Sequence, residues 1–225
     1  MDEILEKYSL PEKPEPDALI EQIERLHRES AAALEDASKL AWLLAQSRKA
    51  CDPSRLRQLL ALLGKTETPH LAFELAKVVI SRSEQMPTDL LKALVEGGGS
   101  EAARSAAIYA LGSSSFGEAG ALLVSIAKDP AESQKVRGYA IESLAGMMDE
   151  RAVAPMVDLV LGSQEPLPPQ VAFWVAYALG ELRSAAGIPA LESLLGDSRP
   201  GDFGKTIAQE AEEALAVIAE PGLQD

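Results

Sequence analysis

The residue types that most often carry catalysis are rare and scattered in this sequence of 225 residues. It contains one cysteine, Cys51, and two histidines, His27 and His70. A cysteine nucleophile needs a base beside it, and the only candidates, His27 and His70, lie far from Cys51 in the sequence, so we predict a turn cysteine. The adjacent acids Glu212 and Glu213 have no second kind of group beside them to divide the roles of acid and base. The sequence therefore predicts no catalytic residue, no metal site and no cofactor.

Aromatic residues, by contrast, are arranged in a way that suggests binding. They make up only 4% of the chain, yet seven of the ten fall at helix positions expected to face away from the core. The seven are Trp42, Phe73, Tyr109, Tyr139, Phe173, Trp174 and Tyr177. Tyr and Trp are enriched at binding hot spots because they bury a large area with few rotatable bonds. The alternative is that helix–helix contacts in an irregular repeat bury some of these rings.

The helices that carry these rings form a repeat. Residues 136–160 (VRGYAIESLAGMMDERAVAPMVDLV) and 171–195 (VAFWVAYALGELRSAAGIPALESLL) are two copies of one pattern. Equivalent apolar anchors recur every 32 to 36 residues, at Leu44, Val79, Leu111, Leu144, Leu179 and Leu215. A period in this range is typical of stacked helical hairpins. We therefore predict an all-α fold, a right-handed α-solenoid of about five to six helical hairpins.

Helix boundaries within each unit follow from breaker residues. Gly112, Gly146 and Gly180 occur near the end of the first helix, and prolines or a glycine follow the second. Pro155 and Pro189 fall inside the second helical pattern, so we place them at or near helix starts, where a missing N–H costs least. The pattern thus predicts two helices in each complete unit.

Composition and charge limit the possible partners. The hydrophobic content of 47% is enough for a sizeable core, and the formal charge is −14. Such an acidic surface repels phosphate backbones and anionic membranes, so neither nucleic acid nor membrane is an expected partner. With one cysteine, no internal disulfide can form, and no apolar run approaches the length of a membrane span. The expected location is the cytoplasm.

The motif VRxxAxxxL…DERAVAPMVDLV resembles the HEAT-like repeat of the phycobilin-lyase type. The resemblance is good over residues 100–219 and weak over 36–97. Arg104 and Arg137 keep the arginine of the motif, whereas Ala172 and Ala208 replace it. The resemblance implies that first helices line a concave surface, with the second, third, sixth and tenth positions after the first core residue pointing there. Because such repeats serve as bilin lyases, scaffold subunits and protein-binding modules, the resemblance does not fix the chemistry.

A helical wheel agrees with this assignment. Counting the position of Val136 as zero, positions zero, four, seven and eight share one face, which we predict to be the core. Small residues at positions four and seven are predicted to let neighbouring helices approach closely. Glu74 and Glu210 at position three, and Glu142 and Glu213 at position six, are predicted to face solvent on the concave side.

The predicted organisation has three parts. Residues 1–15 form an N-terminal tether, 16–34 a capping helix and 35–225 the solenoid. Its repeats are predicted near 36–66, 68–97, 101–129, 133–162 and 168–197, with a terminal helix at 206–219.

The expected function is binding of another protein, one that is basic, on the concave face, as an adaptor or an immunity-type inhibitor. The predicted partner-binding residues are Trp42, Tyr109, Tyr139, Glu142, Phe173, Trp174, Tyr177 and Glu181. The alternative is a bilin or other chromophore lyase, in which the aromatic residues would stack on a tetrapyrrole. The oligomeric state stays open.

Overall fold

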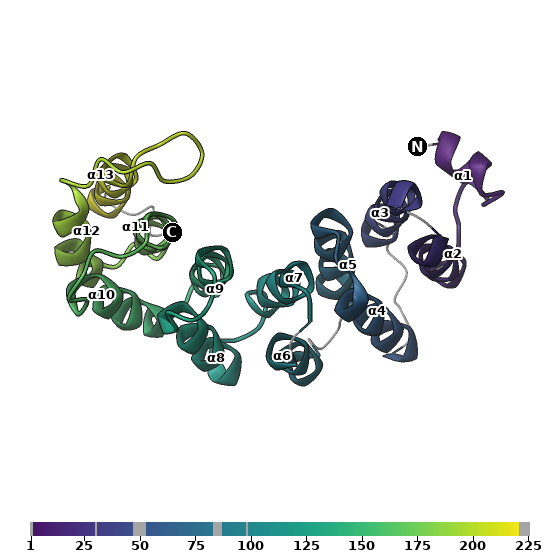
Figure 1. Cartoon of the computed structure of the whole chain (residues 1–225), viewed down its shortest axis with the longest axis horizontal. Coiled ribbons are helices and arrows are strands. Elements are labelled where there is room, and N and C mark those ends of the chain that lie inside the picture. The colour runs from purple at the N-terminus through teal and green to yellow at the C-terminus, as the bar shows by residue number, and fades with distance from the viewer. Residues whose placement is uncertain (1, 30, 47–52, 83–86, 98, 221–225) are drawn as a thin grey trace. The chain divides into compact units, whose positions relative to one another are not determined.

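The computed structural model describes residues 2–29, 31–46, 53–82, 87–97 and 99–220. Within these residues the fold is all-α, and the only extended pairing is an isolated bridge between Pro200 and Thr206. The chain divides into two compact units, Met1–Leu111 and Gly112–Asp225. Each unit is a stretch of stacked helical hairpins, so the predicted all-α solenoid is confirmed (Figure 1).

In the first unit the helices form two rows. The helices of this unit are α1 (Asp2–Lys7), α2 (Pro16–Glu29), α3 (Ala31–Gln46), α4 (Pro53–Lys65), α5 (Pro69–Arg82), α6 (Thr88–Glu96) and α7 (Glu101–Leu111). Helices α3, α5 and α7 pack side by side in one row, and α2, α4 and α6 form the other (Figure 1). Short α1 packs against α3.

The second unit repeats this arrangement. Its helices are α8 (Gly117–Lys128), α9 (Gln134–Gly146), α10 (Val153–Leu161), α11 (Pro169–Glu181), α12 (Ile188–Leu194) and α13 (Ile207–Ala219). Single 3₁₀ turns, Glu150–Ala152 and Ala185–Gly187, precede α10 and α12. Helices α9, α11 and α13 pack in one row, and α8 packs against α9 as α12 packs against α13.

Local sequence signals set the helix ends. Ser133 caps α9 by accepting a hydrogen bond from the backbone N–H of Val136 at 3.3 Å. Thr206 begins α13 with a capping box, in which its hydroxyl and the side chain of Gln209 each accept a backbone N–H. Pro155 and Pro189 lie in the first turns of α10 and α12, which confirms the prediction that they mark helix starts.

The N-terminal segment differs from the sequence prediction. Residues 1–15 were expected to form a tether, but Asp2–Lys7 is helix α1, with Ile4 and Leu5 buried. The carboxylate of Asp36 on α3 accepts hydrogen bonds from Lys7 Nζ at 2.5 Å and from the Tyr8 hydroxyl at 2.6 Å. These long-range contacts order a segment whose composition alone favours an extended chain. The predicted capping helix 16–34 is likewise two elements, since α2 ends at Glu29 and α3 begins at Ala31.

The core follows five of the six predicted repeat anchors, and the sixth, Leu215 on the terminal helix, is half-buried. Leu44, Val79, Leu111, Leu144 and Leu179 are each at most 1% exposed. The predicted core positions zero, four, seven and eight of α9 and α11 are all buried. Because each first helix is packed by neighbours of its own row and of the other row, α7, α9 and α11 are buried over most of their surface.

The two arginines of the motif attach each first helix to the preceding helix. The Nε of Arg137 donates to the carbonyl of Ala127 at 2.9 Å, and the Nε of Arg104 donates to the carbonyl of Val95 at the same distance. Each acceptor lies in the last turn of a second helix, where carbonyl groups have no partner within the helix. An arginine at this repeat position therefore caps the C-terminal end of the preceding helix.

Close helix approach in the second unit depends on glycine at Gly180. A Cβ placed there would lie 2.9 Å from Ala214 Cβ and 3.0 Å from Ala214 Cα on α13. We therefore expect Gly180→Ala to lower the unfolding free energy by about 1–3 kcal/mol, because α11 and α13 would have to move apart. Urea denaturation followed by circular dichroism measures this loss.

Gly117, the first residue of α8, is the matched control for that substitution. A Cβ at this position would meet nothing within 4 Å, so Gly117→Ala should be neutral or stabilising by up to about 1 kcal/mol. Equal stabilities of the two variants would contradict the close packing of α11 on α13.

Candidate functional site

A cluster of aromatic rings lies on the second unit where α11 meets the loop between α12 and α13. The ring of Trp174 is 5.3 Å from that of Tyr177 and 5.8 Å from that of Phe203, both in edge-on geometry. Phe203 is 71% exposed, whereas Trp174 and Tyr177 are half-buried. The cluster is thus partly open to solvent.

Helix α9 supplies the other side of this cluster. Gly138 lies beneath the indole of Trp174, since a Cβ there would come 2.9 Å from Trp174 Cδ1. Tyr139, the next residue, is half-buried and lines a hollow of about 110 Å³ together with Trp174. The other residues that line the hollow are Lys135, Gln170 and Asp202. The hollow is smaller than the roughly 300–1,000 Å³ of small-molecule sites, and it has room for a protruding side chain.

Carboxylates border the rings. Burial, and then the charge of Asp202, raise the pKa of Glu142 on α9 above its ordinary value. Burial also raises the pKa of Tyr177, and the negative charges of Glu181, Glu142 and Glu210 raise it further. Glu142 and Glu181 make no ion pair within the part of the chain that the structure describes. The surroundings of Tyr177 are therefore electronegative. We call Tyr139, Glu142, Trp174, Tyr177, Glu181, Asp202 and Phe203 the aromatic face.

Glu210 and Glu213 are not free acids of this face. Glu210 is only 6% exposed, contrary to the prediction that position three faces solvent. Lys205 pairs with both carboxylates, at 3.0 Å from Glu210 and 2.5 Å from Glu213. Glu210 is buried because α13 packs along α11, and Lys205 from the preceding loop neutralises its charge.

Phe173 was predicted as a partner-binding residue, and this prediction is wrong. Its side chain is fully buried, with its ring 5.8 Å from Trp174 and 6.2 Å from Phe203. The loop at Gly201 passes so close that a Cβ there would lie 2.2 Å from Phe173 Cδ2. Phe173 therefore supports the aromatic face from below.

Phe203 and Asp202, which complete the face, were missed because they lie in a loop outside the helical pattern.

The remaining predicted residues, Trp42 and Tyr109, belong to the first unit. Trp42 on α3 is 40% exposed. Tyr109 on α7 is half-buried, with its ring 5.6 Å from that of Phe73 on α5. The structure thus brings Tyr139, Glu142, Trp174, Tyr177 and Glu181 together in one unit, and describes Trp42 and Tyr109 in the other.

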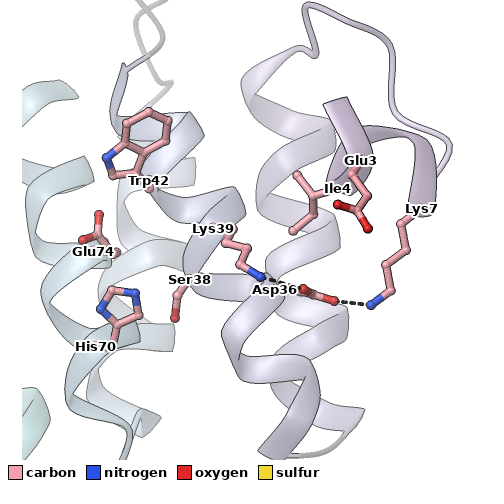
Figure 2. A pocket seen from close by; sticks show the side chains of 9 residues that line it. All are labelled: Glu3, Ile4, Lys7, Asp36, Ser38, Lys39, Trp42, His70 and Glu74. Carbon is pink, nitrogen blue, oxygen red and sulfur yellow. Dashed lines mark hydrogen bonds and ion pairs between the residues drawn. The ribbon is translucent and has the colours of Figure 1, made fainter. Parts of the chain in front are cut away.

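The first unit contains a larger hollow of about 550 Å³, which we call the N-terminal pocket. Helices α1, α3 and α5 line it, and Trp42, His70 and Glu74 stand on its α3–α5 side (Figure 2). The other lining residues are Glu3, Ile4, Lys7, Asp36, Ser38 and Lys39. Glu74, expected at a solvent-facing position, is only 4% exposed. Sequence reasoning missed this pocket because it depends on α1, which was not predicted as a helix.

Residues with metal-binding or nucleophilic chemistry do not gather elsewhere in the described ranges. No group of three or more His, Cys, Asp or Glu side chains there is placed to hold a metal ion. Cys51 lies outside the described residues, and His27 Nε2 is 3.4 Å from the Thr66 hydroxyl.

Among the helices of the described ranges, none has both the length and the apolar character to cross a membrane.

Two rows of helices stacked with a period of 32 to 36 residues define a helical repeat protein of the α-solenoid class. A model of HEAT repeats matches residues 87–167 and 120–216, which together span more than half of the chain. The chain belongs to the HEAT-repeat family. The match does not distinguish the phycobilin-lyase type of the repeat from other HEAT repeats.

One solved structure similar to the chain is that of human deoxyhypusine hydroxylase in complex with glycerol. The match has 17% sequence identity and a TM-score of 0.35, and covers 92% of this chain and 85% of that chain. A likeness at this level carries no argument about function. No curated protein matches the chain in sequence.

Proposed function

We propose that this chain is a protein-binding scaffold and that the aromatic face docks a basic partner protein. The observation that carries the proposal is the partly exposed cluster of Trp174, Tyr177 and Phe203. It is bordered by the carboxylates Glu142 and Glu181, which have no ion-pair partner among the described residues. HEAT repeats suggest interaction surfaces of this kind. Catalysis is not part of the proposal.

Each part of the face has a physical role in such docking. The rings offer a large apolar area that is already held in place, so little conformational entropy is lost on binding. The carboxylates at the rim favour approach of a positively charged partner and mainly affect the association rate. The hollow between Tyr139 and Trp174 accepts one side chain of the partner, with Asp202 at its edge.

Two modes of action fit this face. A constitutive adaptor would hold a basic subunit within an assembly, and an immunity-type inhibitor would cover the site of a basic enzyme or toxin. The phycobilin-lyase type of repeat suggests a third mode, binding of a tetrapyrrole. We prefer a protein ligand because the hollow of about 110 Å³ at this face is below the size of small-molecule sites.

The proposal is tested by capturing the partner with the full chain and joining the purified complex with a carbodiimide, which links carboxylates directly to lysines. We expect cross-links from Glu142 and Glu181 to partner lysines, identified by mass spectrometry. The matched internal controls are Asp158 on α10 and Glu192 on α12, which belong to the second helices. Cross-links from these alone, or visible absorbance from a bound chromophore, would contradict docking at the aromatic face.

A further inference from the structure

The N-terminal pocket contains a buried carboxylate with one unused oxygen. Glu74 on α5 pairs through Oε1 with Lys77 Nζ at 2.8 Å. Its Oε2 is buried and has no hydrogen-bond partner among the described residues. Leaving a buried charged acceptor unsatisfied is costly, so such an atom usually has a partner. An external donor that enters the pocket would remove this cost.

The two lysines on the pocket wall, Lys7 and Lys39, are already paired with carboxylates. Asp36 pairs with Lys7 at 2.5 Å and lies 3.8 Å from Lys39 Nζ, which also pairs with Glu35 at 2.8 Å. Figure 2 shows Asp36 between these two lysines, on the side away from Glu74. The two lysines are therefore engaged by Asp36, while Glu74 keeps an acceptor for a ligand.

Apolar surface lies beside this acceptor. Trp42 on α3 lines the same hollow as Glu74, and Ile4 of α1 lines it from the other side (Figure 2). The indole is 40% exposed. An aromatic ring and a carboxylate facing one hollow form a suitable environment for a cation, because the ring face attracts positive charge and the carboxylate accepts a charge-assisted hydrogen bond.

We propose that the N-terminal pocket binds a ligand with an ammonium or guanidinium group on a short apolar stem. The cationic group donates to Glu74 Oε2, and the stem lies against Trp42 and Ile4. The volume of about 550 Å³ is within the range of small-molecule sites. This site is independent of the proposed docking at the aromatic face, since its residues all belong to the first unit.

The test follows the fluorescence of Trp42 in the full chain carrying Trp174→Phe, which leaves one indole. We expect n-pentylamine and agmatine to change the emission saturably, whereas n-pentanol and hexanoate do not, since they lack the positive charge. Glu74→Gln should weaken amine binding at least about tenfold, the size of one hydrogen bond to a charged group. Glu67→Gln, at an exposed position of the same unit, is the matched control and should bind normally.

Two further measurements keep the outcome clear. Saturating pentylamine should raise the melting temperature of the parent chain but not that of Glu74→Gln. If Glu74→Gln does not fold, Trp42→Leu is titrated by calorimetry, and loss of amine binding is expected there.

An acetylated and amidated Gly-Arg-Gly peptide then distinguishes the two possible sources of the cation, a free small molecule and a protein side chain. Binding of the peptide without binding of the free amines would assign the site to a protein side chain. No binding of any cation at about 10 mM, equal binding of pentanol, or unchanged affinity in Glu74→Gln would overturn the proposal.

Discussion

Replacing Phe173 by alanine is expected to lower the unfolding free energy by about 3–5 kcal/mol, the usual cost of removing a large buried aromatic ring. The side chain is fully buried and is packed against Gly201. Its loss leaves a cavity beneath Trp174 and Phe203 that the surrounding helices cannot fill. Urea denaturation of the full chain, followed by circular dichroism, measures the effect.

The matched control is Phe203→Ala in the same ring cluster. Because Phe203 is 71% exposed, this variant should lose less than about 1 kcal/mol. If Phe173→Ala were as stable as Phe203→Ala, the loop at Gly201 would not be anchored by Phe173, and the support of the aromatic face would have to be sought elsewhere.

The second large effect concerns partner binding. We expect Trp174→Ala to weaken binding of the partner by at least about 2 kcal/mol, or roughly 30-fold in the dissociation constant, as for a central hot-spot residue. The indole sits over Gly138 and contacts the rings of Tyr177 and Phe203. Calorimetry with the captured partner measures the affinity, and thermal denaturation confirms that the variant is folded.

Two other variants make this result interpretable. Phe116→Ala removes a ring that contacts Arg151 at 4.7 Å, outside the aromatic face, and should leave binding unchanged. Glu181→Lys changes an exposed acid and should slow association with a basic partner, with a smaller effect at high salt. Normal binding by a folded Trp174→Ala chain would move the docking surface to the second helices or to the N-terminal segment.

The sequence predicted the repeat architecture well because its signals are local and periodic. The anchors Leu144 and Leu179 are buried as expected, and Gly146 and Gly180 lie at the ends of α9 and α11. The small residue at position seven of α13, Ala214, receives Gly180 in close contact. Each of these features recurs at the same place in successive units. A pattern that recurs in this way is a stronger signal than a single occurrence, which could arise by chance.

The helical wheel was less successful for side chains because it assumes one buried face. A first helix in this stack is packed by helices on several sides, which buries some residues at positions two and three as well. Phe173, Glu74 and Glu210 are therefore buried, although the wheel places them opposite the core. The wheel is most reliable at position six, where the side chains keep contact with solvent as predicted: Trp42 is exposed, and Glu142 and Tyr177 are half-buried.

The N-terminal pocket could not be predicted from any single segment. It requires α1, which has six residues and is held on α3 by Lys7 and Tyr8 through Asp36. The unsatisfied state of Glu74 Oε2 depends on where Lys77 and the neighbouring helices lie. Such a site is defined by three elements together and leaves no spacing pattern in the sequence.

The extensive burial of the first helices has a consequence for evolutionary comparison. In α9 and α11, eight of the thirteen residues of each helix are buried, so selection for packing alone should keep these positions nearly constant among related chains. Invariance of Ala140 or Leu179 would then reflect the stack and not its ligand. Selection for binding should instead be visible as constraint at accessible positions, where drift is otherwise free, and Trp174, Glu181 and Phe203 are the positions at which such constraint would be most informative.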